Sequence, residues 1–120
     1  MDMLELARNF IGAIESGELA SVRACYAPNA RIWHNFDDAE QTVDENLKVL
    51  EWMKRKTTRR SYEVSRLEEI AGGYLQQHVL RMVTREGKEL CMPACLVVRV
   101  EDGRITRLEE YLDPSPTREL

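Results

Sequence analysis

Three short signals that contain glycine divide the second half of the chain into strand-length segments. The dipeptides Gly72-Gly73, Glu86-Gly87 and Asp102-Gly103 are typical of tight β-hairpin turns, because such turns need residues that accept a positive φ. The segments between and around them are residues 58–71, 74–85, 88–101 and 104–113. This order predicts a sheet of successive antiparallel strands in the second half of the chain.

The first half of the chain shows helical spacing instead. Apolar residues recur at helical intervals from Leu4 to Ile14, with Asp2 placed to cap the start and Gly17 placed to end the helix. A third helix is predicted after the capping box at residues 42–45, and its last turn, residues 54–56, is basic, as suits the negative end of a helix dipole.

Between these two helices the chain changes direction. A short second helix is predicted from Leu19 to Tyr26, and Pro28-Asn29 then breaks the helical pattern. Residues 30–35 predict a short strand.

The segment Leu90 to Val98 is apolar at nearly every position, although a strand with one face in water would alternate. Three helices can cover only one face of such a sheet. We therefore expect a second copy of the chain to cover the outer face, which makes the protein a homodimer. Pro93 within this segment predicts a bulge or kink.

Size and charge limit the classes of function. The chain has 120 residues and a net charge of −4, which predicts a single domain over residues 1–120, with a frayed tail at 114–120, and makes nucleic-acid binding unlikely on charge grounds. The longest apolar run, 90–98, is too short to cross a membrane, and the acidic N-terminus does not resemble a signal peptide. Three cysteines, an odd number, favour reduced thiols and a cytoplasmic location.

We expect neither a metal nor another cofactor. Cys91 and Cys95 lie four residues apart on one strand, about 13 Å from one another, which is too far to share a metal ion. The sequence also lacks a phosphate-binding loop, a dinucleotide fingerprint and a G-x-S-x-G elbow.

The order of the elements resembles the nuclear transport factor 2-like superfamily, which includes ketosteroid isomerase and SnoaL-type polyketide cyclases. The stretches that carry the resemblance are residues 10–19, 26–35 and 102–113. The resemblance implies an α+β fold: a cone-shaped barrel in which three N-terminal helices pack in the concavity of a strongly curved, mostly antiparallel sheet. Within this superfamily, the amino-acid sequence is most similar to those of bacterial SnoaL-like proteins.

The residues at the positions that match the ketosteroid isomerase site differ from those of that enzyme. That enzyme uses an Asp base after the first strand and an oxyanion hole formed by a Tyr and a protonated Asp. The matching positions here are His34, Phe10 and Cys95. Phe10 cannot donate a hydrogen bond and Cys95 donates only weakly. The resemblance therefore predicts no classical steroid isomerisation.

Limonene-epoxide hydrolase resembles the chain in the same places. Its Tyr and Asn around the first strand match Trp33 and Asn35. Its Arg and Asp match Gln76 and His78, and its remaining Asp matches Glu110. The Arg is lost, so the arrangement that activates water is not intact, although a His and a Glu could still activate water.

The candidate catalytic residues are His34, His78 and Glu110. The sequence contains only these two histidines, and a histidine near neutral pKa can act as acid or base. Glu110 is in phase with Leu108 and Leu112, in an apolar setting that raises a carboxyl pKa unless a histidine pairs with it. We predict a His–Glu dyad in which Glu110 orients a histidine. The simpler interpretation is an edge residue in an ion pair with an arginine.

The candidate substrate-binding residues are mostly apolar. They are Phe10, Ile14, Trp33, Asn35, Gln76, Cys95, Leu108 and Leu112. For Trp33 the simpler interpretation is packing, and for Asn35 it is a turn cap.

Two classes of function are consistent with these residues. The first is cofactor-independent proton transfer on a small, mostly apolar, oxygenated molecule, as in an isomerase, dehydratase, cyclase or hydrolase. The second is a dimeric ligand-binding or stress-associated module without turnover.

Overall fold

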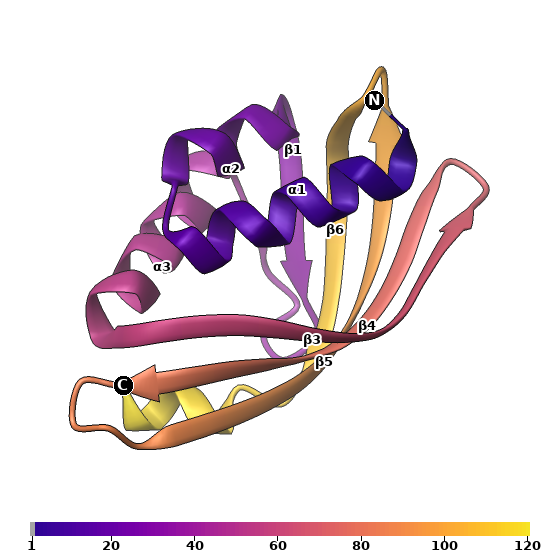
Figure 1. Cartoon of the computed structure of the whole chain (residues 1–120). Helices are drawn as coiled ribbons and strands as arrows, with labels where there is room; N and C mark the ends of the chain where they lie inside the picture. Colours follow the sequence, from indigo (N-terminus) through magenta and orange to yellow (C-terminus); the bar gives the residue numbers. More distant parts are fainter. Residues whose placement is uncertain (1) are drawn as a thin grey trace.

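The three helices lie together on one side of a bent sheet (Figure 1). The structure is a computed structural model, and it describes residues 2–120. Within that range the elements follow the order α1 (Met3–Ser16), α2 (Leu19–Cys25), β1 (Tyr26–His34), β2 (Glu40–Gln41), α3 (Val43–Lys56), β3 (Thr57–Ile70), β4 (Gly73–Thr84), β5 (Glu89–Glu101), β6 (Arg104–Leu112) and the short 3-10 helix η1 (Ser115–Glu119). The predicted α+β class is confirmed.

The helix boundaries follow from local side-chain chemistry. The carboxylate of Asp2 accepts a hydrogen bond from the backbone N–H of Glu5 at 2.8 Å, and Gly17 ends α1 with a left-handed φ of 75°. Thr42 and Glu45 form the predicted reciprocal capping box at the start of α3. These caps determine where α1 and α3 begin, and so which residues each helix presents to the sheet.

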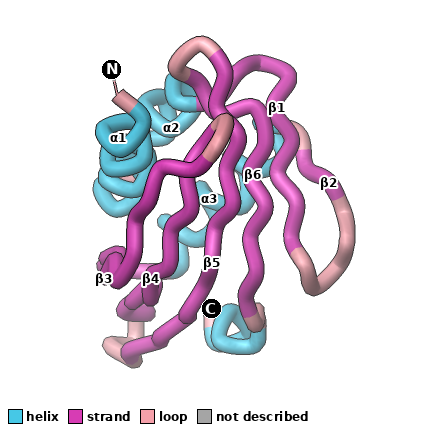
Figure 2. The backbone as a smooth tube through the Cα atoms, turned by 90° about the vertical axis from the view of Figure 1, so that its right-hand side faces the viewer, coloured by secondary structure: helices cyan, strands magenta, loops and turns pink. Residues whose placement is uncertain are grey.

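The sheet has the strand order β2-β1-β6-β5-β4-β3 within residues 2–120. β1 runs parallel to β6, and each of the other neighbouring pairs is antiparallel. Figure 2 shows the strands side by side, with the helices behind them. The sheet is curved but does not close into the barrel that we expected, because β2 and β3 are both edges. The space between these edges is occupied by helices, and α1 packs against β3.

The helices bury the concave face of the sheet. Phe10 and Ile14 of α1 pack in one core with Ile32, Leu96 and Leu108 of the strands. On the opposite, convex face the apolar side chains are only partly covered by this chain. Val79 of β4 and Pro93 of β5 are paired on this face, and Val79 is half-buried whereas Pro93 is exposed.

Of the two alternatives predicted at Pro93, a bulge or a kink, the bulge is absent. The pairing of β4 with β5 runs without a register shift through Val79 and Pro93. The pairing of β5 with β6 begins only at Ala94, opposite Leu112. Pro93 therefore lies just beyond the end of β6, on a locally unpaired strand edge where a residue without an N–H is tolerated.

The C-terminal residues that we expected to fray form a turn of helix in this structure. The carboxylate of Asp113 accepts from the backbone N–H of Ser115 at 2.9 Å, directly before η1. Lys88 pairs with Glu119 at 2.6 Å, and Leu120 packs against the core. No helix among residues 2–120 is long and apolar enough to cross a membrane.

We predict opposite effects of alanine at two glycines. At Gly73 an added Cβ would lie 1.7 Å from the backbone oxygen of Val98, and neither backbone can move without breaking the β4–β5 ladder. Gly73→Ala should therefore lower the free energy of unfolding by about 4 kcal/mol or more. At Gly12, inside α1, an added Cβ meets no atom within 4 Å, so Gly12→Ala should raise it by about 0.5–1 kcal/mol.

Urea denaturation of both variants checks these expectations. A Gly73→Ala protein as stable as the wild type would contradict the close approach of β4 and β5 at this turn.

Candidate functional site

A histidine and a glutamate meet where β1 and β6 run side by side. His34 and Glu110 occupy paired positions of the parallel ladder, and their side chains point to the concave face. The His34 Nε2 atom lies 3.1 Å from Glu110 Oε1, and the two side chains are only 12% and 21% exposed. The structure thus brings together two of the three predicted catalytic residues, with the partner histidine on the first strand.

Glu110 faces a small cavity between the helices and the concave face of the sheet. The cavity measures about 50 Å³, well below the roughly 300 Å³ of a typical pocket for a drug-sized ligand. It is lined by Phe10, Ile11, Ile14, Tyr26, Ile32, Asn46, Leu50, Tyr62, His78, Leu96, Leu108 and Glu110. Most of these side chains are apolar, so the polar groups of Glu110, His78 and the two tyrosines stand in a largely dry environment.

His78 is the second histidine at this cavity, and it is 3% exposed. Its Nδ1 atom lies 2.9 Å from the side-chain Nε2 of Gln76, and the ring of Tyr62 packs edge-on at 4.8 Å between centroids. Its Nε2 atom has no hydrogen-bond partner within residues 2–120. Burial lowers the pKa of His78, and the negative charge of Glu110 opposes this shift.

Two tyrosines supply hydroxyl groups to the same cavity. The hydroxyl of Tyr26 donates to Asn46 Oδ1 at 2.9 Å, and Asn46 in turn donates to Gln41 Oε1 at 3.2 Å. Burial raises the pKa of Tyr26 and of Tyr62, and the charge of Glu110 raises both further. Both hydroxyls therefore stay protonated and can donate hydrogen bonds.

Sequence reasoning assigned no functional role to Tyr26, Tyr62 or Asn46. Tyr26 was visible as part of an apolar stripe, but it begins β1 instead of ending a helix. Tyr62 lies opposite Leu80 on β4, so its place on the concave face follows only from the pairing register.

The predicted substrate-binding residues divide between the two faces. Phe10, Ile14 and Leu108 line the cavity. Gln76 is fully buried beside His78, and Leu112 is half-buried against the core.

Trp33 and Cys95 lie on the convex face. Trp33 packs against Tyr111 at 5.3 Å between ring centroids, and Cys95 is paired with Tyr111 in the sheet. Since successive side chains of a strand alternate between faces, Leu96 lines the cavity and its neighbour Cys95 does not.

Asn35 closes the end of the β1–β6 ladder. Its backbone N–H donates to the carbonyl of Glu110 at 3.2 Å, and its side-chain oxygen accepts from the backbone N–H of Leu112 at 2.9 Å. The side chain therefore acts as a turn cap that keeps Glu110 in register with His34.

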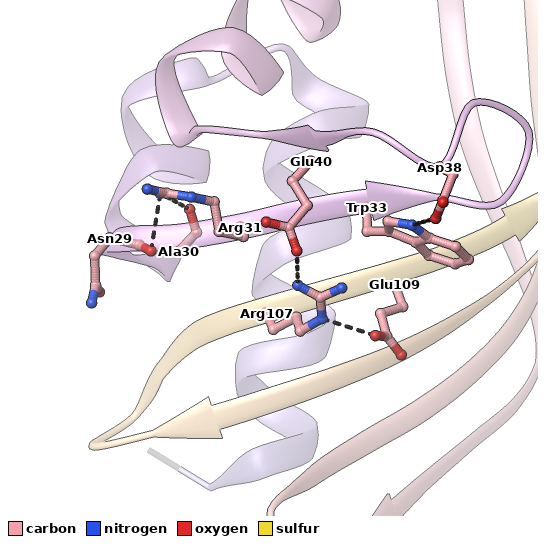
Figure 3. A network of polar contacts seen from close by, with 8 residues as sticks. All are labelled: Asn29, Ala30, Arg31, Trp33, Asp38, Glu40, Arg107 and Glu109. Atoms are coloured by element: carbon pink, nitrogen blue, oxygen red, sulfur yellow. Dashed lines mark hydrogen bonds and ion pairs between the residues drawn. The ribbon is translucent and has the colours of Figure 1, made fainter.

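A polar network on the convex face anchors the same strand end (Figure 3). Arg107 donates to Glu40 Oε2 at 2.6 Å and to Glu109 Oε2 at 2.8 Å, which ties β2 to β6. The indole N–H of Trp33 donates to Asp38 Oδ1 at 2.7 Å across the turn that follows β1. These contacts hold Trp33, which precedes His34, and the turn that follows it.

The arrangement holds a carboxylate at the cavity in a fixed position. One oxygen of Glu110 contacts His34, so the carboxylate is oriented. Within the part of the chain that the structure describes, no three His, Cys, Asp or Glu side chains gather closely enough to hold a metal ion.

Comparison with known proteins gives a consistent picture. Residues 7–108 match the family model described as a SnoaL-like domain. No curated protein matches the sequence. IdmH from Streptomyces antibioticus, a proposed polyketide cyclase, has a similar structure with a TM-score of 0.86 and 17% identity, over 99% of this chain and 97% of that one.

Two further solved structures share the fold. An epoxide hydrolase of M. tuberculosis that is similar to limonene-epoxide hydrolase has a TM-score of 0.77 and 16% identity, over 96% of this chain and 85% of that one. A nuclear transport factor 2-like protein of unknown function from Burkholderia pseudomallei has a TM-score of 0.81 and 18% identity, over 100% and 98% of the two chains. At such identities the likeness establishes the fold alone.

We predict that buried His78 makes the stability of the protein depend on pH. Because burial lowers the pKa of His78, the unfolded chain binds more protons than the folded protein as the pH falls through about 6.5. The free energy of unfolding therefore decreases as the pH falls. Between about pH 7.5 and pH 5.5 the wild type should lose more stability than His78→Gln, as measured by urea denaturation.

The groups that face His78 from neighbouring strands are Glu110, Tyr62 and Tyr26, and α1 and α3 add no charge to the cavity. Leu80→Ala is the control, because Leu80 is buried on the same strand but does not titrate. This variant should lower the free energy of unfolding equally at both pH values. Equal losses in the wild type and in His78→Gln would refute the prediction.

Proposed function

The chain belongs to the SnoaL-like domain family, and on this basis we propose that it binds a small, mostly apolar, oxygenated molecule in its cavity and moves a proton on it without a cofactor. Glu110 would be the proton acceptor and His34 the residue that orients it. This reverses the roles that we expected from the sequence, because Glu110 lines the cavity and His34 stands behind it.

The observation that carries this proposal is the partly buried His34–Glu110 contact at 3.1 Å. This contact holds the carboxylate at the cavity, where a general base must lie within reach of the proton that it takes. Tyr62 and His78 line the same space and carry groups that can donate to a substrate oxygen. Abstraction of a proton from carbon or from water fits this set of groups.

The reaction would be an isomerisation, dehydration, cyclisation or hydration. Classical ketosteroid isomerase chemistry stays outside the proposal, because Phe10 has no donor and the β5 position that faces the cavity is Leu96. A proposed polyketide cyclase and an epoxide hydrolase are among the proteins of similar structure, which agrees with cyclisation and hydration as candidate reactions.

The alternative proposal is a module that binds a ligand without turnover. The lack of a donor at Phe10 favours it, whereas the cavity of about 50 Å³ limits either function to a ligand well below drug size. Native mass spectrometry of the purified protein identifies any ligand that the protein retains. The ligand can then be tested for conversion, which distinguishes an enzyme from a binding module.

We predict that the protein catalyses exchange of the α-hydrogens of cyclohexanone in D2O, measured by proton NMR. Glu110→Gln, which keeps the shape but loses the basic carboxylate, should reduce the exchange rate by about 10²–10⁴-fold. Because His34 acts through Glu110, His34→Asn should slow exchange in the wild type but add little to Glu110→Gln.

Glu109→Gln is the matched control. Glu109 precedes Glu110 on β6 but lies on the convex face, and Arg107 retains Glu40 when Glu109 is changed. Exchange should therefore proceed at the wild-type rate in this variant. Loss of exchange in Glu109→Gln, or full exchange in Glu110→Gln, would contradict the assignment of Glu110 as the base.

We also propose that the protein is a homodimer that buries the convex face of the sheet, in the cytoplasm. Val79, Cys95 and Val97 are half-buried on this face, which lies opposite to the helices α1, α2 and α3, and Arg107 and Glu109 lie on the same face. A second copy would remove this apolar surface from water. Free thiols at all three cysteines are consistent with a reducing compartment.

Val97→Asp should convert the dimer into a monomer, because the charge would be buried without a partner. Val49→Asp is the control, since Val49 is 44% exposed on α3, away from the sheet. Sedimentation velocity gives the mass of each variant. A wild-type protein that sediments as a monomer would rule out the proposed dimer.

A further inference from the structure

Gln76 and His78 form a buried pair on one face of β4. The two residues are two positions apart, so their side chains lie on the same face, and the Gln76 Nε2 atom approaches His78 Nδ1 to 2.9 Å. Both side chains are almost completely inaccessible to solvent, at 0% and 3% exposure. In this contact the amide NH2 group donates and Nδ1 accepts. A neutral imidazole whose Nδ1 accepts must carry its proton on Nε2.

The charges around His78 favour the same tautomer. Glu110 from β6 lines the same cavity and is the only charged side chain among its lining residues; the others that can titrate are Tyr62 of β3 and Tyr26 of β1. A negative carboxylate stabilises a proton on the nitrogen that faces the cavity. It disfavours the alternative, in which Nε2 would present a lone pair to the same space.

Nε2 of His78 has no hydrogen-bond partner within residues 2–120. A buried donor without a partner destabilises a protein, so such donors are rare unless a ligand uses them. Burial also lowers the pKa of His78, which keeps the imidazole neutral at pH 7. His78, which lines the cavity, is therefore a hydrogen-bond donor rather than a proton acceptor.

We propose that Gln76 holds the proton of His78 on Nε2, so that His78 binds an oxygen of the ligand as a hydrogen-bond donor while Glu110 is the base. Gln76 is then a positioning residue, and the ligand is a molecule with a carbonyl oxygen. This inference rests on the proposed function and assigns to His78 the donor role in it.

The proton balance of the step is simple. The carboxylate of Glu110 takes a proton from the carbon next to the carbonyl group, the electron pair of that C–H bond forms a carbon–carbon double bond, and the π pair of the C=O bond moves to the oxygen. The Nε2–H of His78 stabilises the negative charge on this oxygen and keeps its own proton. Glu110 then returns the proton to carbon, so no oxidant or other reactant is required.

The test is nitrogen NMR of the ligand-free protein at pH 7. Two-bond proton–nitrogen spectra distinguish a protonated from an unprotonated ring nitrogen, and His34→Asn leaves His78 as the sole imidazole of the chain. We expect His78 to have a protonated Nε2 and an unprotonated Nδ1. A protonated Nδ1, alone or together with Nε2, would overturn the proposal.

Gln76→Glu tests the cause of this tautomer. A carboxylate at position 76 can only accept, so it should draw a proton onto Nδ1 and change the nitrogen pattern of His78. Gln77→Glu is the matched control, because Gln77 is exposed on the convex face and should leave the pattern unchanged. A folded Gln76→Glu protein with the wild-type pattern would show that Gln76 does not set the tautomer. If this variant does not fold, the wild-type spectrum alone decides.

The donor role is tested with cyclohexanone and with methylenecyclohexane, which has nearly the same shape but no oxygen. Cyclohexanone should shift the Nε2–H signal of His78, and methylenecyclohexane should not. A bound ketone that leaves this signal unmoved would refute the donor role. Absence of cyclohexanone exchange alone counts against the proposed function, whereas the tautomer is measured without a ligand, so the two failures are distinguishable.

Discussion

The parallel pairing of β1 with β6 is the contact on which the rest of the structure depends. Among the strands within residues 2–120, each other neighbouring pair joins strands that follow one another in the chain. The β1–β6 pair instead brings together residues as far apart as His34 and Glu110, 76 positions from one another. It attaches the helical first half to the sheet, and it places a histidine beside a carboxylate. Asn35 on one side and Arg107 with Glu40 on the other keep this pair in register.

The concave face combines an apolar core with a few polar groups that carry defined roles. Tyr26 and Asn46 satisfy one another, His34 holds Glu110, and Gln76 holds His78. In an apolar cavity a polar group without a nearby partner is disfavoured, so such pairs hold their side chains in place. In the function that we propose, Glu110 accepts a proton and His78 donates a hydrogen bond. The same burial keeps the cavity small, which limits the size of any ligand or substrate.

The two faces of the sheet differ in what covers them. Helices cover the concave face, whereas the convex face presents half-buried valines beside charged residues. Trp33 and Cys95 belong to this second face, so their chemistry concerns packing, possible partners and the anchoring of β1 rather than the cavity. The concave side of β5 is apolar because it packs in the core beneath the helices. The apolar convex side is the surface that the proposed dimer would bury.

Local patterns in the sequence determined the α+β class, the caps of α1 and α3, and the three hairpin turns, because hydrophobic periodicity, side-chain capping and glycine turns act between residues close in the chain. The resemblance to the nuclear transport factor 2-like superfamily, rather than these patterns, pointed to His34, His78 and Glu110 as a group. Only the tertiary structure decided which histidine meets Glu110, that Leu96 and not Cys95 faces the cavity, that Pro93 causes no bulge, and that Tyr26 and Tyr62 join the site. Each of these depends on pairing register and on which elements cover a face, and a shift of one residue along a strand reverses the face without changing the local pattern.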